Sequence, residues 1–240
     1  ANDAMTELIK LASKGVICMI ELLDGRTVKD WRKLLDRHLH IVHTEEAQGA
    51  LLAVGAPRVV VDGIEAQGAV SPDDRWAQIT ANLARISARI EPAPAHDRKA
   101  VLVCYGPSLN TGMGKIRELA EAGADVVSVS GAHDALLANG IVPRYHIECD
   151  PRPHKADNIE KAHPAVEYLL ASCIHPRVID KTLAATDNVR LWHVAQQEHT
   201  IRLVDTLHES RETIISGGGS VGLRAIPVLY AYGYRDFAVF

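Results

Sequence analysis

The sequence predicts an α/β fold: a Rossmann-like, doubly wound, mostly parallel sheet, preceded by a smaller helical or α/β N-terminal region. From Lys99 onward, short apolar runs alternate with stretches rich in Ala, Leu, Glu and Lys, which is typical of strands alternating with helices. The runs lack a polar face, as expected for strands buried on both sides of a parallel sheet. Small or glycine-rich turns follow several of them. The expected strands are 100–105, 125–129, 145–148, 168–171, 189–194, 213–215 and 236–240.

Composition narrows the functional classes. The chain has 240 residues, 47% of them hydrophobic, and a formal net charge of −4, which argues against a nucleic-acid partner. No run of 18 apolar residues predicts a membrane span, and the first residues lack the pattern of a secretion signal. Four cysteines stand far apart without a CxxC pair, so we expect reduced thiols in a cytoplasmic protein.

The chain is expected to divide into three parts. Residues 1–70 form an N-terminal α/β cap or oligomerisation region, 71–98 an amphipathic helix and linker, and 99–240 the Rossmann-like nucleotide-binding domain. The helix begins at Ser71, Pro72 and two acids. Its apolar stripe should pack on a neighbouring domain or subunit, and the N-terminal helices could join a homo-oligomer. Because Phe240 lies within an apolar run, we expect this domain to continue beyond it. The stripe comprises Trp76, Ile79, Leu83, Ile86 and Ile90.

The bend Gly106-Pro107-Ser108 is the first candidate site. It joins the first expected strand to a helix, whose initial N–H groups lack partners within the helix and can bind an anion such as a nucleotide phosphate. Gly106 allows close approach of the backbone, and Ser108 offers a hydroxyl. The segment is neither a dinucleotide fingerprint nor a P-loop, so an ordinary turn is the alternative interpretation.

The second expected strand ends in Ser128-Val-Ser130-Gly131-Ala132-His133. Small hydroxyl side chains such as Ser130 can line a base or ribose pocket, although small residues here could equally serve close helix packing. His133 is a candidate acid or base catalyst, and a position in the first turn of a helix is its alternative role.

The third expected strand ends in Glu148-Cys-Asp150-Pro-Arg152-Pro. Glu148 and Asp150 are two residues apart, so both should face one side of an extended chain. Such acids can hold Mg²⁺, bind a ribose or orient a substrate hydroxyl, and Asp150 is a catalytic candidate. Arg152 could bind phosphate. A helix cap or a solvated carboxylate is the alternative.

A glycine-rich segment precedes the last expected helix. Gly217, Gly218, Gly219 and Ser220 follow a β-branched run, and successive glycines are more costly than a simple connector requires. We therefore expect a second loop that brings backbone N–H groups and the Ser220 hydroxyl to a ligand. Arg224, one turn into the helix, could reach a phosphate, or it could be a surface charge.

In order, the segments GPSLN, SVSGAHDALLANGIVPRYHIECDPRP and SGGGSVGLRAIPVLYAYGYRDFAVF resemble the domain shared by MptE-like 6-hydroxymethylpterin diphosphokinases and Maf motility accessory factors. A fainter similarity extends to bacterial CMP-sialic-acid transferases. The resemblance covers about residues 75–240. It implies that Gly106, Pro107 and Ser108 bind nucleotide phosphate or sugar, that Asp150 is the acid at the strand end, and that Gly218, Gly219 and Ser220 contact the nucleotide.

The resemblance implies a nucleotide-dependent transferase, foremost a Maf-like glycosyltransferase whose donor is a nucleotide-activated nonulosonic, sialic-acid-like sugar. One alternative is an MptE-like pyrophosphokinase, in which Glu148 and Asp150 hold Mg²⁺ while a hydroxymethylpterin-type alcohol attacks ATP. Magnesium is a cofactor only under that alternative. Another is a noncatalytic nucleotide-binding module. In the transferase, Arg152 or Arg224 would stabilise the departing phosphate, and Asp150 or His133 would assist the acceptor hydroxyl. The acceptor itself is not identified.

Overall fold

A computed structural model describes residues 70–195, 212–215 and 220–240. The chain divides into one unit from Ala1 to Ala66 and a second from Gln67 to Phe240, and only the second contains described residues. The expectations for the N-terminal region and for Gly217, Gly218 and Gly219 lie outside the described residues.

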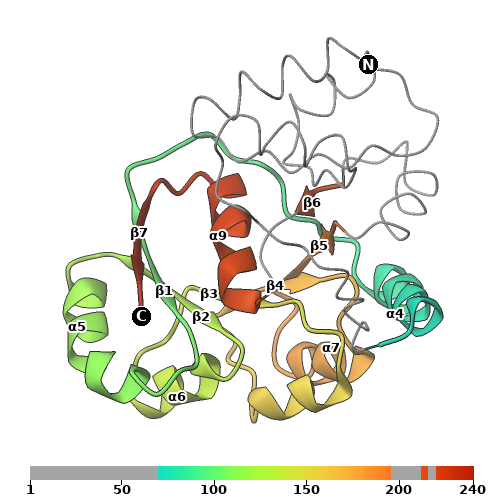
Figure 1. Cartoon of the computed structure of the whole chain (residues 1–240), viewed down its shortest axis with the longest axis horizontal. Coiled ribbons are helices and arrows are strands. Elements are labelled where there is room, and N and C mark those ends of the chain that lie inside the picture. Colours follow the sequence, from blue (N-terminus) through green and yellow to red (C-terminus); the bar gives the residue numbers. More distant parts are fainter. Residues whose placement is uncertain (1–69, 196–211, 216–219) are drawn as a thin grey trace, which may run out of the picture. The chain divides into compact units, whose positions relative to one another are not determined.

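The second unit is built on a seven-stranded parallel sheet (Figure 1). This arrangement confirms the predicted α/β class. The strands follow the order β6-β5-β4-β3-β2-β1-β7 across the sheet. Their bounds are β1 Lys99–Val103, β2 Asp125–Val129, β3 Tyr145–Glu148, β4 Glu167–Ala171, β5 Val189–Val194, β6 Ile214–Ile215 and β7 Asp236–Val239.

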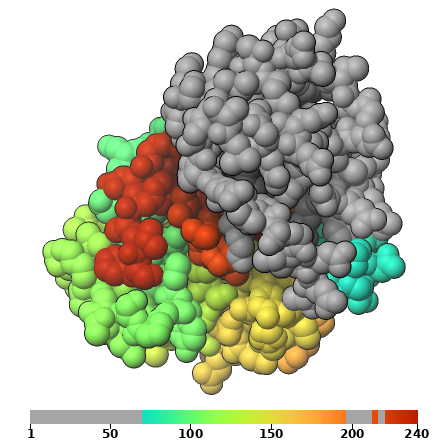
Figure 2. Space-filling view, in the orientation of Figure 1, coloured from blue at the N-terminus to red at the C-terminus, as the bar shows by residue number. Residues whose placement is uncertain are grey.

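The strand order reverses beside β1. The chain moves outward from β1 to β6 and then returns to place β7 against the free side of β1. Consequently, the C-terminal segment, in red, lies against the green segment that contains β1 and the helix α5, Leu109–Glu121 (Figure 2). In parallel α/β sheets, ligands bind beyond the carboxyl ends of the strands at such a reversal. The end of β1 is therefore the first place to look for a site.

Helices cover both faces of the sheet (Figure 1). One core groups Val101, Val103 and Val126 with α5 and α6, whereas the larger core groups Ala100 and Leu102 with α9. Because neighbouring residues of a strand point to opposite faces, β1 contributes to both cores. The helices are α4 Pro72–Arg85, α5 Leu109–Glu121, α6 Ala132–Ala138, the 3₁₀ helix η1 Pro153–Asn158, α7 Pro176–Leu183 and α9 Val221–Ala231.

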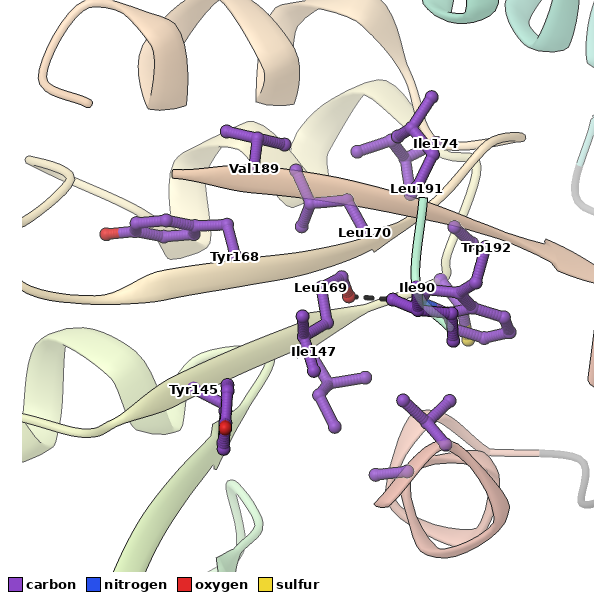
Figure 3. Packing of buried hydrophobic residues seen from close by; sticks show 14 of the residues in the cluster. Ile90, Tyr145, Ile147, Tyr168, Leu169, Leu170, Ile174, Val189, Leu191 and Trp192 are labelled. Carbon is purple, nitrogen blue, oxygen red and sulfur yellow. Dashed lines mark hydrogen bonds between the residues drawn. The ribbon is translucent and has the colours of Figure 1, made fainter. Parts of the chain in front are cut away.

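The centre of the larger core is aliphatic and aromatic (Figure 3). Ile147, Leu169 and Trp192 come from three adjacent strands and are fully buried. The indole N–H of Trp192 donates to the Leu169 carbonyl at 3.1 Å, which satisfies its polar group as burial requires. This core holds the carboxyl ends of β3 and β4 in a fixed position.

Helix α4 begins as expected but ends early. Ser71 caps it by accepting from the Asp74 N–H at 3.1 Å. The apolar spacing predicted a helix through Ile90, yet Ile86 is extended, and Arg89 forms a parallel bridge with Leu191. Pairing with β5 thus replaces the last helical turn, and Ile86 and Ile90 are buried against the sheet. Within residues 70–195, 212–215 and 220–240, no helix is both long and apolar enough to cross a bilayer.

Candidate functional site

The bend after β1 opens directly into α5. The Leu109 N–H donates to the Gly106 carbonyl at 3.0 Å, and Thr111 Oγ1 donates to the Ser108 carbonyl at 2.8 Å. Residues 106–108 are exposed, and Ser108 occupies the capping position without a side-chain capping bond. Its hydroxyl is therefore available to a ligand beside the N-terminus of a 13-residue helix.

The first turn of α9 lies on the end of β1. A Cβ placed on Gly222 would come within 2.8 Å of Cys104 Sγ, so the absence of a side chain allows this approach. Ser220 Oγ caps α9 by accepting from the Leu223 N–H at 3.3 Å. The two bends singled out in the sequence, at 106–108 and at Ser220, thus belong to segments that meet at Cys104.

Ser130 takes a backbone conformation that is uncommon for a residue with a side chain. Its φ is +49°, in the left-handed region. Its hydroxyl donates to Glu148 Oε2 at 2.7 Å, which links the end of β2 to the end of β3. The next residue, Gly131, lies under the ring of Tyr105, where an added Cβ would be 2.9 Å from the ring.

Glu148 points inward. Its side chain is 1% exposed, and Oε1 accepts from the N–H groups of Cys149 and Asp150 at 2.9 and 3.0 Å. Burial raises the pKa of Glu148, and the hydrogen bonds from Ser130 and these backbone groups only partly oppose that rise. Both carboxylate oxygens of Glu148 are therefore engaged within the protein.

Asp150 lies between two cations. Arg152 Nε donates to its carboxylate oxygens at 2.9 and 3.0 Å, and Lys155 Nζ lies 3.4 Å from Oδ2. Burial would raise the pKa of Asp150, but the hydrogen bonds from Arg152 and the charge of Lys155 outweigh it and lower the pKa. Asp150 is therefore ionised at neutral pH, and Arg152, with 45% of its side chain exposed, faces solvent.

Arg224 adds positive charge to the same edge. Burial raises the pKa of Cys149 to about 12, and the Arg224 guanidinium opposes this rise. Arg224 also acts against the burial that raises the pKa of Cys173. These effects place its charge near Cys149 and Cys173, which follow β3 and β4.

His133 lies in the interior. Its side chain has no solvent exposure, and its ring nitrogens contact Asp134 Oδ1 at 2.6 Å and the Tyr168 hydroxyl at 2.8 Å. The Tyr168 oxygen also accepts from the His163 N–H at 2.7 Å. His133 lies in the first turn after Ser130, but its buried ring has no access to a substrate.

The structure also forms a serine, histidine and glutamate series that the sequence analysis did not anticipate. Ser172 Oγ lies 2.8 Å from His193 Nδ1, and His193 Nε2 lies 2.8 Å from Glu212 Oε2. Ser172 is 1% exposed and His193 is fully buried. Arg89 binds Glu212 at 2.9 Å. A substrate cannot reach the buried serine. The series instead has a structural role, because its hydrogen bonds connect β4, β5 and the segment before β6.

A surface groove of about 660 Å³ lies elsewhere on this unit. It lies between residues 71–81, mostly in α4, and residues 175–176 at the start of α7, and it touches the first residue of η1, Pro153. Gln78 connects the groove to the segment between β3 and η1 by donating to the Pro151 carbonyl at 3.3 Å. Its lining residues are Val70, Ser71, Asp74, Ala77, Gln78, Ala81, Pro153, His175 and Pro176.

The edge of β1, β2 and β3 therefore gathers most of the predicted residues that can be placed. Gly106, Pro107 and Ser108 follow β1, Ser130 follows β2, and Glu148, Asp150 and Arg152 follow β3. Sequence reasoning missed Tyr105 and Lys155. An aromatic residue just before the bend and a lysine three residues after Arg152 were the available signals. In the described part of the chain, no group of three His, Cys, Asp or Glu side chains is arranged to hold a metal ion.

Comparisons with known proteins agree with this organisation. A comparison with curated protein sequences finds no match. The structure of a Maf glycosyltransferase from Magnetospirillum magneticum AMB-1 is similar, with a TM-score of 0.53 and 14% sequence identity. The similar region covers 98% of this chain but 36% of that protein, and at this identity it supports the fold alone. A family model described as 6-hydroxymethylpterin diphosphokinase MptE-like matches residues 77–240. Since this match spans more than half of the chain, the protein belongs to the MptE-like family.

Proposed function

We propose that this chain is a nucleotide-dependent transferase, and specifically a Maf-like glycosyltransferase whose donor is a nucleotide-activated nonulosonic, sialic-acid-like sugar. The observation that carries the proposal is the charge at the sheet edge. Arg152 and Lys155 contact Asp150, and Arg224 lies near Cys149. The excess of positive charge suits a donor with a phosphate and a sugar carboxylate, because both groups are anionic.

The proposed chemistry breaks the bond between the sugar's anomeric carbon and a phosphate oxygen. The bonding electron pair leaves with the nucleotide monophosphate, and the acceptor oxygen forms the new bond. Arg152, Arg224 and the positive end of the α5 helix dipole would stabilise the charge that develops on the departing phosphate. Asp150 would orient the acceptor hydroxyl and receive its proton as the new bond forms.

The competing function is a magnesium-dependent pyrophosphokinase, which the name of the matching family favours. It needs carboxylates that can turn toward a cation beside ATP. Here Glu148 is engaged by Ser130 and two backbone N–H groups, and Asp150 by Arg152. Holding Mg²⁺ with Glu148 would require breaking its three hydrogen bonds, whereas the proposed glycosyl transfer leaves them in place, so the position of Glu148 favours the glycosyltransferase.

A ligand-binding panel on the full chain separates the two functions. The ligands are CMP and CDP without metal, and ATP with and without Mg²⁺. A ligand at 100 times its dissociation constant should stabilise the protein by about 2.7 kcal/mol in thermal unfolding. Stabilisation by CMP without metal supports the proposal. A response only to ATP with Mg²⁺ would replace it with the kinase function, and no response to any nucleotide would contradict both.

An arginine variant tests the site itself. Arg152→Gln removes a charged donor from the edge, so we expect the dissociation constant for CMP to rise about 10-fold or more, since hydrogen bonds to charged groups contribute about 1.5–3 kcal/mol. Arg85→Gln is the matched control, because Arg85 also pairs with an aspartate, Asp180, at 2.7 Å and is similarly exposed. Equal effects of the two variants on CMP binding would remove Arg152 from the proposed site.

A further inference from the structure

Tyr105 is an exposed aromatic residue within the candidate site. It directly follows Cys104 and precedes the Gly106-Pro107-Ser108 bend. Of its residue surface, 70% is accessible to solvent, the largest fraction among the exposed large hydrophobic residues in the described part of the chain. Leaving a tyrosine ring in water forgoes the stabilisation that its burial would supply. We therefore examine whether the Tyr105 ring contacts a ligand.

The ring is held by its surroundings. It lies against Gly131, where an added Cβ would be 2.9 Å from both Cγ and Cδ1 of Tyr105. Contact with these ring atoms leaves room for no side chain at position 131. Ser130, on the other side of that peptide bond, is fixed by its hydrogen bond to Glu148. The tyrosine ring thus contacts the Gly131 backbone, which adjoins the hydrogen-bonded Ser130.

A second exposed apolar residue belongs to the same junction. Leu223 is 59% exposed and follows Gly222, which packs on Cys104. Two of the five exposed large hydrophobic residues in the described part of the chain thus belong to the two segments that meet at Cys104. The cations of the edge lie at the neighbouring strand ends, on Arg152 and Arg224. An apolar surface beside positive charge suits a ligand that has both a planar ring and a phosphate.

We infer that Tyr105 is the platform on which the heteroaromatic ring of the donor nucleotide stacks while its phosphate lies toward the bend and the arginines. This inference rests on the proposed nucleotide-dependent function and adds a residue that recognises the base. Stacking of a base on an aromatic side chain tolerates different bases, because each base has a π face. Selection among nucleotides must therefore come from other contacts.

Titration of the full chain with CMP and with ribose 5-phosphate tests this inference. CMP has a base and ribose 5-phosphate does not, so only CMP can use the platform. Tyr105→Ala should raise the dissociation constant for CMP about 10-fold, as expected for one lost stacking contact, and leave that for ribose 5-phosphate unchanged. Tyr105→Phe keeps the ring and should bind CMP within about 2-fold of the wild type. Isothermal titration measures CMP binding, and ligand-observed NMR measures ribose 5-phosphate binding.

Tyr230→Ala is the matched control. Tyr230 is also exposed, at 55%, but it lies near the other end of α9 with the Arg235 guanidinium 3.5 Å over its ring. This variant should bind CMP as the wild type does. If Tyr105→Ala also binds CMP as the wild type does, or loses CMP and ribose 5-phosphate equally, the platform is ruled out while the proposed function stands.

The two proposals fail in different ways. If the wild type binds ATP with Mg²⁺ but not CMP, and Tyr105→Ala weakens ATP binding about 10-fold, the platform is supported and the proposed glycosyl donor is wrong. If the wild type binds none of these nucleotides, both the platform and the proposed function are overturned.

Discussion

Two hydrogen-bonded polar clusters of this protein both contain an aspartate, but they differ in which side chains reach solvent. The edge cluster, Ser130, Glu148, Asp150 and Arg152, extends from a buried carboxylate to an arginine side chain that is 45% exposed. The interior cluster is His133, Asp134 and Tyr168, and its histidine and tyrosine have no exposure. A ligand can reach the first cluster, whereas the second joins α6 to β4.

The difference shows that residue types common in catalytic sites do not by themselves identify a catalytic site. An Asp–His–Tyr series and a Ser–His–Glu series both look suited to proton transfer, yet in this protein each satisfies buried polar groups. Buried polar groups without partners are costly, so networks of this kind are expected wherever a histidine enters a core. The Arg152 side chain, which is 45% exposed, distinguishes the edge cluster, because the Asp134 side chain is 32% exposed and that of Asp150 only 12%.

The largest expected effect tests the interior cluster. His133→Leu puts an apolar side chain in the same place but removes a hydrogen-bond partner from the Tyr168 hydroxyl and from Asp134. The free energy of unfolding should fall by about 3 kcal/mol, the scale for broken buried polar networks. Urea unfolding measures this loss, and CMP binding by the variant that remains folded should be unchanged.

His154→Leu serves as the control for this comparison. His154 is exposed in η1, and its substitution should change stability by no more than about 0.5 kcal/mol. If His133→Leu instead keeps its stability but abolishes nucleotide binding or transfer, the interior cluster is part of the site and the distinction between the clusters is wrong.

Local sequence patterns predicted the strands well and the site only in part. Apolar runs such as Val101 to Val103 have few alternatives to a buried parallel strand, and the structure confirms the strand pattern. The end of α4 was missed because Ile86 and Ile90 continue the helical spacing, while pairing of Arg89 with Leu191 depends on a residue 102 positions away. Local spacing carries no information about that partner.

The candidate site shows the same limit. Glu148 and Asp150 were expected to face one side, because an extended chain repeats every two residues. In the structure, the Ser130 hydroxyl and two backbone N–H groups draw Glu148 inward, whereas Asp150 binds Arg152 near the surface. Similarly, only tertiary structure places His133 beside Tyr168. Residue types that can perform chemistry were visible in the sequence, but their access was not.

An effect of intermediate size tests the contact between Gly222, in the first turn of α9, and Cys104, which follows β1. Gly222→Ala would place a methyl group within 2.8 Å of Cys104 Sγ, and such overpacking should destabilise the protein by about 1–2 kcal/mol. Adding Cys104→Ala removes the sulfur and should restore most of the loss. Thermal unfolding of both single variants and the double variant forms a double-mutant cycle that measures this contact.

Gly114→Ala provides the matched glycine control. Gly114 lies within α5 and has no atom within 4 Å of an added Cβ, so alanine should stabilise the helix by about 0.5–1 kcal/mol. If Gly222→Ala is equally stabilising, then the first turn of α9 does not press on the end of β1, and the proposed meeting of the two bends is wrong.

The smallest expected effect is a dependence of stability on pH. It compares Glu148, at the carboxyl end of β3, with Asp125, at the amino end of β2. Because burial raises the pKa of Glu148, the folded state takes up this proton first as the pH falls. Wild-type stability relative to Glu148→Gln should therefore rise between neutral pH and about 4, the ordinary pKa range of glutamate. Unfolding in urea across this range measures the difference.

Asp125, at the amino end of β2, should give the opposite trend. Burial would raise the pKa of Asp125, but hydrogen bonds from Arg98 and Tyr234 outweigh it and lower the pKa, so the unfolded state takes up this proton first. Wild-type stability relative to Asp125→Asn should therefore fall as the pH drops below about 4. Parallel trends for the two variants would mean that Glu148 is not held in the dry, hydrogen-bonded position that separates it from Asp150.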